Sequence, residues 1–128
     1  MVKEKYNIEF VLGNASQQSL WRMLTEPTAL EEWFADKVNL KDEIFYTFTW
    51  DNKTTSAEMV LKKPISQVRY SWLVEDSSNT YFEFRLHKMA LTGGIALEIT
   101  DFAYPNDKDD AVFLWENQID ELKRRLGI

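Results

Sequence analysis

A long amphipathic helix at the end of the chain limits the possible folds most strongly. Between Asn106 and Leu126 the apolar residues recur at steps of three and four, which places them on one face of a helix of about six turns. These residues are Val112, Trp115, Ile119, Leu122 and Leu126. Acidic residues begin the stretch, and three basic residues precede Gly127, as the helix dipole favours. Such a helix needs a large apolar surface to lie on.

The residues before this helix predict that surface. After Asp36, apolar and polar residues alternate over about seventy residues, which is typical of antiparallel strands with one covered face. The predicted inward rows are Ile44, Tyr46, Phe48 and Trp50; Thr55, Ala57, Met59 and Leu61; Val68, Tyr70, Trp72 and Val74; Phe82, Phe84 and Leu86; and Ile95, Leu97 and Ile99. We expect a strongly curved sheet, because antiparallel sheets twist and curl.

The first third of the chain completes the predicted order of elements. A strand from Tyr6 to Leu12 precedes two short helices, the first capped by Ser16 and the second begun by Pro27. The sequence therefore predicts an α+β fold with about seven antiparallel strands. The two short helices follow the first strand, and the long C-terminal helix lies in the concave face of the sheet.

Composition narrows the classes of function. The length of 128 residues, of which 45% are hydrophobic, suits one domain over residues 1–128. A net charge of -6 disfavours a nucleic-acid partner, and no apolar run approaches the ~20 residues of a membrane span. The charged N-terminus lacks the apolar region of a signal peptide, so we expect a cytoplasmic protein. The absence of cysteine excludes disulfides, thiol nucleophiles and thiolate metal sites.

Four segments stand out for their tryptophan, proline and alternating apolar residues: 20–27 (LWRMLTEP) with 30–34 (LEEWF), then 66–72, 93–102 and 113–115. The first resembles the opening helices, and the other three are similar to later parts, of small bacterial START-like proteins of the helix-grip superfamily. The superfamily includes the birch pollen allergen and the homologues of the activator of heat-shock-protein ATPase. The chain departs from the family pattern at Glu26, where Asp is frequent, and at Leu114, where glycine is frequent.

The resemblance implies a single helix-grip domain with a cavity between the sheet and the long helix. In the superfamily this cavity holds apolar ligands, although some members act through protein contacts and others are enzymes. The side chains expected to line it are Tyr46, Phe48, Trp50, Tyr70, Trp72, Phe82, Phe84, Trp115 and Ile119. Aromatic walls with few polar points are usual in small-molecule pockets. The same side chains could instead meet and fill the core completely.

Candidates for chemistry are few. By alternation Asp101 continues the row of Ile95, Leu97 and Ile99, where burial would raise its pKa and make it an acid or base. We rather expect the strand to bulge or end there, so that Asp101 faces water. His87, the only histidine, shares the polar face of its strand with Glu83 and Arg85, with which it could form a surface charge ladder.

No metal or cofactor is expected. The pair Gly93-Gly94 lacks the third glycine and the helix start of a phosphate loop, so it is interpreted as a turn. The acidic run from Asp107 to Asp110 lacks the ligand spacing of a calcium loop.

Three functions therefore stay open. The favoured one is noncatalytic binding of a small hydrophobic or amphipathic molecule, such as a lipid, between the sheet and the C-terminal helix. The alternative is a co-chaperone-like module that contacts a protein partner, or a second copy of the chain, through an exposed surface. Phe113 lies off the apolar stripe of the helix and is the candidate for that contact. The third is an enzyme that uses Asp101 or a tyrosine on a substrate in the cavity.

Overall fold

A computed structural model describes residues 2–73 and 79–128 of the chain. The elements are β1 (Glu4–Val11), α1 (Gln17–Thr25), α2 (Pro27–Trp33), β2 (Lys37–Lys41), β3 (Phe45–Trp50), β4 (Lys53–Lys63), β5 (Gln67–Trp72), β6 (Tyr81–Lys88), β7 (Ile95–Ala103) and α3 (Lys108–Leu126). Val74, the last residue of one predicted inward row, lies outside the described residues.

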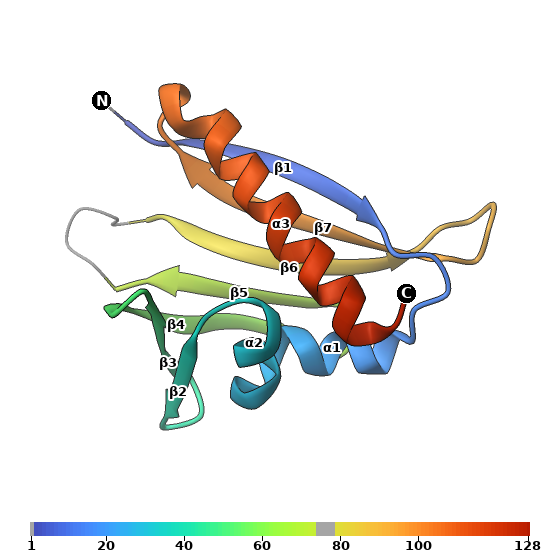
Figure 1. Cartoon of the computed structure of the whole chain (residues 1–128), viewed down its shortest axis with the longest axis horizontal. Helices are drawn as coiled ribbons and strands as arrows, with labels where there is room; N and C mark the ends of the chain where they lie inside the picture. Colours follow the sequence, from blue (N-terminus) through green and yellow to red (C-terminus); the bar gives the residue numbers. More distant parts are fainter. Residues whose placement is uncertain (1, 74–78) are drawn as a thin grey trace.

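The described strands form one antiparallel sheet in the order β1-β7-β6-β5-β4-β3-β2. Figure 1 shows α3 crossing the face of this sheet, with α1 and α2 placed on the same side near β3 and β4. The predicted α+β fold is confirmed, with seven strands, two short helices after the first strand and a long helix against the sheet.

Three of the predicted helix ends are also confirmed. The Ser16 hydroxyl accepts a hydrogen bond from the Ser19 amide, and Pro27 occupies the first turn of α2. Gly127 ends α3 with a φ of +74°, a left-handed conformation that glycine adopts at low cost. The helix begins two residues later than predicted, because Pro105–Asp107 forms a separate 3-10 turn.

The apolar stripe of α3 faces the sheet. Trp115, Ile119 and Leu122 are buried, while Val112 and Leu126 at the two ends are half-buried against the core. Burial of such a stripe, rather than helix propensity, is the main source of stability for a helix of this kind.

Two residues leave the predicted inward rows. A β-bulge between Met59 and Leu61 shifts the register of β4, so that Leu61 pairs with Arg69 on the polar side of β5. Ile44 precedes β3 and stays 36% exposed. The inward placement predicted for both side chains is therefore wrong, since alternation alone does not reveal a bulge or a strand end.

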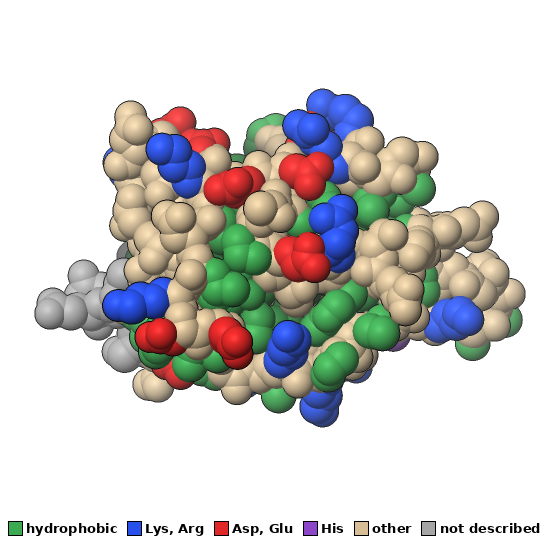
Figure 2. All heavy atoms as spheres, turned by 90° about the horizontal axis from the view of Figure 1, so that it is seen from below, with side chains coloured by type: hydrophobic (Ala, Val, Ile, Leu, Met, Phe, Trp, Pro, Cys, Tyr) green, Lys and Arg blue, Asp and Glu red, His purple; other side chains and the backbone are tan. Residues whose placement is uncertain are grey.

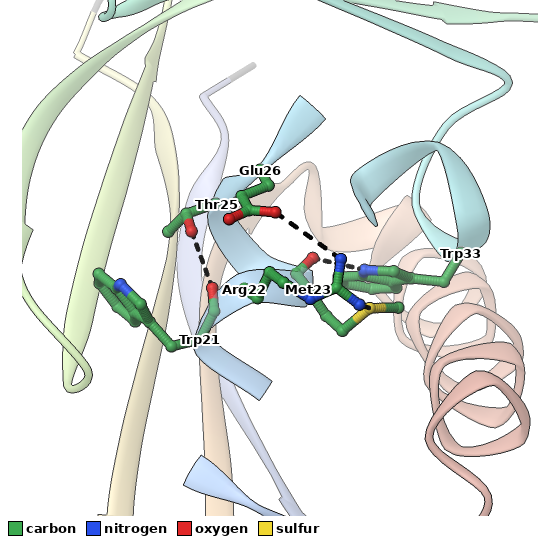
Figure 3. A network of polar contacts seen from close by, with 6 residues as sticks. All are labelled: Trp21, Arg22, Met23, Thr25, Glu26 and Trp33. Atoms are coloured by element: carbon green, nitrogen blue, oxygen red, sulfur yellow. Dashed lines mark hydrogen bonds and ion pairs between the residues drawn. The ribbon is translucent and has the colours of Figure 1, made fainter. Parts of the chain in front are cut away.

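Three aromatic side chains satisfy the last backbone carbonyls of α1, which have no partner inside the helix. The Trp33 indole donates to the Met23 carbonyl, and Figure 3 shows this bond across the corner between α1 and α2. In the same way, the Tyr70 hydroxyl donates to the Leu24 carbonyl and the Tyr46 hydroxyl to the Thr25 carbonyl, each at 2.7 Å. The two tyrosine hydroxyls are thereby committed to holding α1 against the sheet.

The same corner carries two further polar contacts. The Thr25 hydroxyl donates to the Trp21 carbonyl, and Arg22 lies 3.7 Å from the Glu26 carboxylate (Figure 3). The exposed ion pair adds little stability, so the aromatic donors are what fix α1 in place.

Candidate functional site

A pocket of about 370 Å³ opens between the sheet and α3. Its lining residues come from the end cap of α2, from β3 and the turn after it, and from β5, β6, β7 and α3: Phe34, Trp50, Asp51, Trp72, Phe82, Asp101, Ala111, Leu114, Trp115 and Gln118. The volume falls at the lower end of the range of ~300–1,000 Å³ for small-molecule pockets. The pocket therefore suits a compact ligand.

Four of the nine predicted lining residues reach this pocket, namely Trp50, Trp72, Phe82 and Trp115. The other five lie behind it in the packed core: Tyr46, Phe48, Tyr70, Phe84 and Ile119. The space between sheet and helix is thus filled over much of its length and open at one end.

Phe34 marks the boundary between the filled and the open part. Its ring lies 5.2 Å, between ring centroids, from each of Phe48, Trp50 and Phe82. It also stacks on Trp115 at 5.8 Å, with an angle of 24° between the rings. The position of Phe34 just after α2 gave no signal that its ring would close one wall of the pocket.

The backbone carbonyl of Phe34 joins three elements at the pocket. It accepts hydrogen bonds from the Trp50 indole at 2.6 Å and from the Gln118 side-chain amide at 2.9 Å. These bonds tie the end of α2 to β3 and α3, so the pocket wall is held by the backbone as well as by ring packing.

Asp101 lies on the inner side of β7, against the expectation that it faces water. The strand continues without a bulge to Ala103 and pairs Asp101 with Tyr6 of β1. One carboxylate oxygen accepts hydrogen bonds from the Tyr6 hydroxyl at 3.1 Å and the Trp115 indole at 2.9 Å. The other oxygen accepts from the Phe102 amide at 2.8 Å. Asp101 therefore joins β1 and α3 at the pocket wall.

Burial dominates the electrostatics of this carboxylate. Desolvation raises the pKa of Asp101, although hydrogen bonds from Trp115, Phe102 and Tyr6 and the charge of Lys3 lower it in part. Burial also raises the pKa of Tyr6, and the nearby charge of Asp101 adds to that effect. Tyr6 thus keeps its proton and donates a hydrogen bond to Asp101, and its hydroxyl is poorly suited to act as a base.

The residues on the outer face of the sheet pair across strands. His87 lies 3.1 Å from the Glu9 carboxylate of β1, and Arg69 lies 2.7 Å from Glu83. The predicted ladder along β6 is replaced by these contacts with neighbouring strands, and none of the four side chains lines the pocket. Within the described residues, no group of three or more His, Asp or Glu side chains could hold a metal ion.

A second hollow lies on another face, between α1, α2, β3 and β4. This groove has a volume of about 730 Å³ and is bordered by Trp21, Met59 and Leu61 as well as by charged side chains such as Arg22 and Glu43. Figure 2, seen from the side of α1 and α2, shows hydrophobic side chains scattered among acidic and basic ones on this face. The pocket beside α3 has the more consistently apolar wall.

The family model of the START-like superfamily domain matches residues 1–128 of the chain. The chain belongs to the START-like superfamily. Among solved structures, a Bacteroides fragilis protein is 38% identical to this START-like protein, with a TM-score of 0.68, over 98% of this chain and 92% of its own. No protein with a curated description matches the chain.

Two more distant structures share the fold. One is the Aha1 dimer from Colwellia psychrerythraea, with a TM-score of 0.76 and 17% identity over 100% of this chain and 98% of its own. The other is DynU16, a protein in the dynemicin biosynthetic locus, with a TM-score of 0.77 and 14% identity over 96% of this chain and 47% of its own. At these identities the likeness shows the fold alone. None of the helices in the described part of this START-like protein could cross a lipid bilayer.

Proposed function

We propose that this START-like protein binds a small amphipathic molecule, without converting it, in the pocket between the sheet and α3. The observation that carries the proposal is an aromatic pocket left open at one end of an otherwise filled core. Apolar walls with a few fixed polar groups are how proteins usually bind small molecules. Here the walls are rings of Trp50, Trp72 and Trp115, and Asp101 and Gln118 supply polar atoms.

The pocket wall is preorganised. The indole of Trp50 is held by the Phe34 carbonyl and that of Trp115 by the Asp101 carboxylate. Because these side chains are fixed before a ligand arrives, binding costs little side-chain entropy. A rigid apolar pocket of this size favours selective binding of compact ligands over long lipid chains.

A fluorescence titration tests the proposal. The pocket contains three of the five tryptophans, so a panel of small cationic, neutral and anionic aromatic compounds should include some that change the emission saturably. Ala111→Phe fills the pocket from α3 and should abolish these changes. Ala90→Phe, in the exposed turn after β6, is the matched control and should retain them. Saturable binding that survives Ala111→Phe would refute this site.

A second candidate function is contact with a second copy of the chain. Phe113 and Leu114 are 63% and 59% exposed on α3, and the related Colwellia structure is described as a dimer. Adjacent exposed apolar side chains of this size favour a protein contact. If the contact forms, Phe113→Asp should shift a dimer to monomer in light scattering. Leu91→Asp, at a side chain 99% exposed in the β6–β7 turn, should leave it unchanged. A monomer at all concentrations would exclude this function.

A further inference from the structure

We propose that the ligand of this pocket is an organic cation, an amine or quaternary ammonium group attached to a compact apolar body. The inference rests on the proposed binding function and names the chemical class of its ligand. It follows from three properties of the wall: its aromatic rings, the sign of its charges and the direction of its hydrogen bonds.

Five aromatic side chains surround the pocket: Phe34, Trp50, Trp72, Phe82 and Trp115. The faces of such rings attract cations, tryptophan most strongly, and rings placed around one point form the usual binding site of quaternary ammonium groups. The indole N–H groups of Trp50 and Trp115 already donate to the Phe34 carbonyl and to Asp101. Each of these side chains therefore offers a ligand its ring carbons.

The charges at the pocket are acidic. Asp51 and Asp101 belong to the lining, and the described lining includes no Lys, Arg or His. Two nearby lysines are not part of the lining: Lys3 lies over the Tyr104 ring at 5.5 Å, from where its charge acts on Asp101, and Lys108 lies over the Tyr6 ring at 6.0 Å. Attraction between unit charges is much stronger in a partly desolvated pocket than in water. The wall thus favours a positive ligand.

The hydrogen bonds of the pocket wall also favour a positive ligand. The Tyr6 hydroxyl, the Trp115 indole and the Phe102 amide all donate to Asp101, which acts as an acceptor in this wall. The Gln118 side-chain nitrogen also donates, to the Phe34 carbonyl. An anionic ligand needs donors, and the Trp50 and Trp115 indoles and the Gln118 side-chain amide already have acceptors. Among the described lining residues this leaves the Trp72 indole as the one ring donor for such a ligand. A cation needs acceptors and rings, which the wall presents.

An isosteric series tests the inference directly. Phenyltrimethylammonium and tert-butylbenzene have nearly the same shape and differ in the positive charge, while benzoate carries a negative one. Titrations followed by tryptophan fluorescence should give a dissociation constant for phenyltrimethylammonium about tenfold lower than that for tert-butylbenzene, with benzoate the weakest. Equal or tighter binding of tert-butylbenzene overturns the inference and leaves the binding function standing. If none of the three compounds binds, both are overturned.

Replacing single aspartates by asparagine shows which carboxylates attract the cation. Asp51→Asn should weaken binding of phenyltrimethylammonium several-fold and leave tert-butylbenzene unchanged, and asparagine tolerates the positive φ of 47° at this position. Asp101→Asn should weaken binding of phenyltrimethylammonium more than Asp51→Asn does, although this variant also loses one of the two acceptor oxygens of Asp101. Asp109→Asn, exposed in the first turn of α3, makes the same change in net charge and should have no effect. An equal loss in Asp109→Asn and Asp51→Asn would mean a long-range field effect and would contradict the assigned site.

Discussion

Replacing Phe34 by alanine should destabilise the protein by about 4 kcal/mol. Phe34 is 4% exposed and its ring contacts those of Trp115, Phe48, Trp50 and Phe82. Burying a phenylalanine side chain removes roughly 150–250 Å² from water, which at ~25 cal/mol per Å² corresponds to about 4–6 kcal/mol as an upper bound. Measured Phe→Ala changes in cores cost about 3–5 kcal/mol, which brings the expected value to the middle of that range.

The variant should still fold, because the carbonyl of Phe34 keeps its hydrogen bonds from Trp50 and Gln118. Urea denaturation followed by far-ultraviolet circular dichroism gives the free energy of unfolding without relying on the neighbouring tryptophans. Phe34→Leu keeps much of the apolar volume and should cost about half as much. A loss below about 1.5 kcal/mol for Phe34→Ala would show that this ring does not separate the core from the pocket.

Three further predictions concern buried polar groups. Tyr70→Phe should cost about 1–3 kcal/mol in urea denaturation, because the Leu24 carbonyl loses its donor; no loss would argue against this contact. Burial raises the pKa of Tyr6, Tyr46 and Tyr70 above 10.0, so the folded state keeps protons that the unfolded state releases. Stability is therefore full below pH 10 and should fall above it, by up to ~4 kcal/mol per pH unit for three groups, and a flat profile would contradict this. The raised pKa of Asp101 means that the folded state binds a proton more readily than the unfolded one, so its contribution to stability should fall as pH rises from about 3.8 through the raised pKa. The difference in unfolding free energy between wild type and Asp101→Asn, measured against pH, should follow that fall.

Much of the fold was predictable because each level of the sequence points to the same structure. Apart from Leu61, the alternation between residues 46 and 99 sets the inner face of the sheet, and the three-and-four spacing in α3 provides the stripe that covers it. Ser16, Pro27 and Gly127 mark helix ends through local backbone chemistry. Such signals require no knowledge of which distant residues meet.

The pocket was less predictable because it depends on distant contacts. Alternation shows that Tyr46, Tyr70 and Trp72 face inward, but only the position of α1 decides that the two tyrosine hydroxyls bind its carbonyls while Trp72 reaches the pocket. Phe34 closes one wall because α2 ends beside β3 and α3.

Irregularities at single residues explain the other features that the sequence did not predict. The parity of Asp101 was correct, but the end of β7 could not be placed closely enough to decide whether the side chain faces inward. In β4 the bulge before Leu61 reverses which side chains face inward, and no glycine or proline within the strand indicates the bulge in the sequence. Asp51, Ala111, Leu114 and Gln118 were not predicted as lining residues, because they flank the aromatic rows and show no apolar alternation of their own.

Indole N–H resonances in a two-dimensional ¹⁵N–¹H spectrum test ligand binding in this pocket most directly. Trp50, Trp72 and Trp115 line the pocket, whereas Trp21 borders the groove beside α1 and Trp33 is bonded to the Met23 carbonyl. During titration with phenyltrimethylammonium, the first three resonances should shift saturably with a common dissociation constant, and the other two should stay in place. Saturable shifts confined to Trp21, or no saturable shift in any indole, would contradict binding between the sheet and α3.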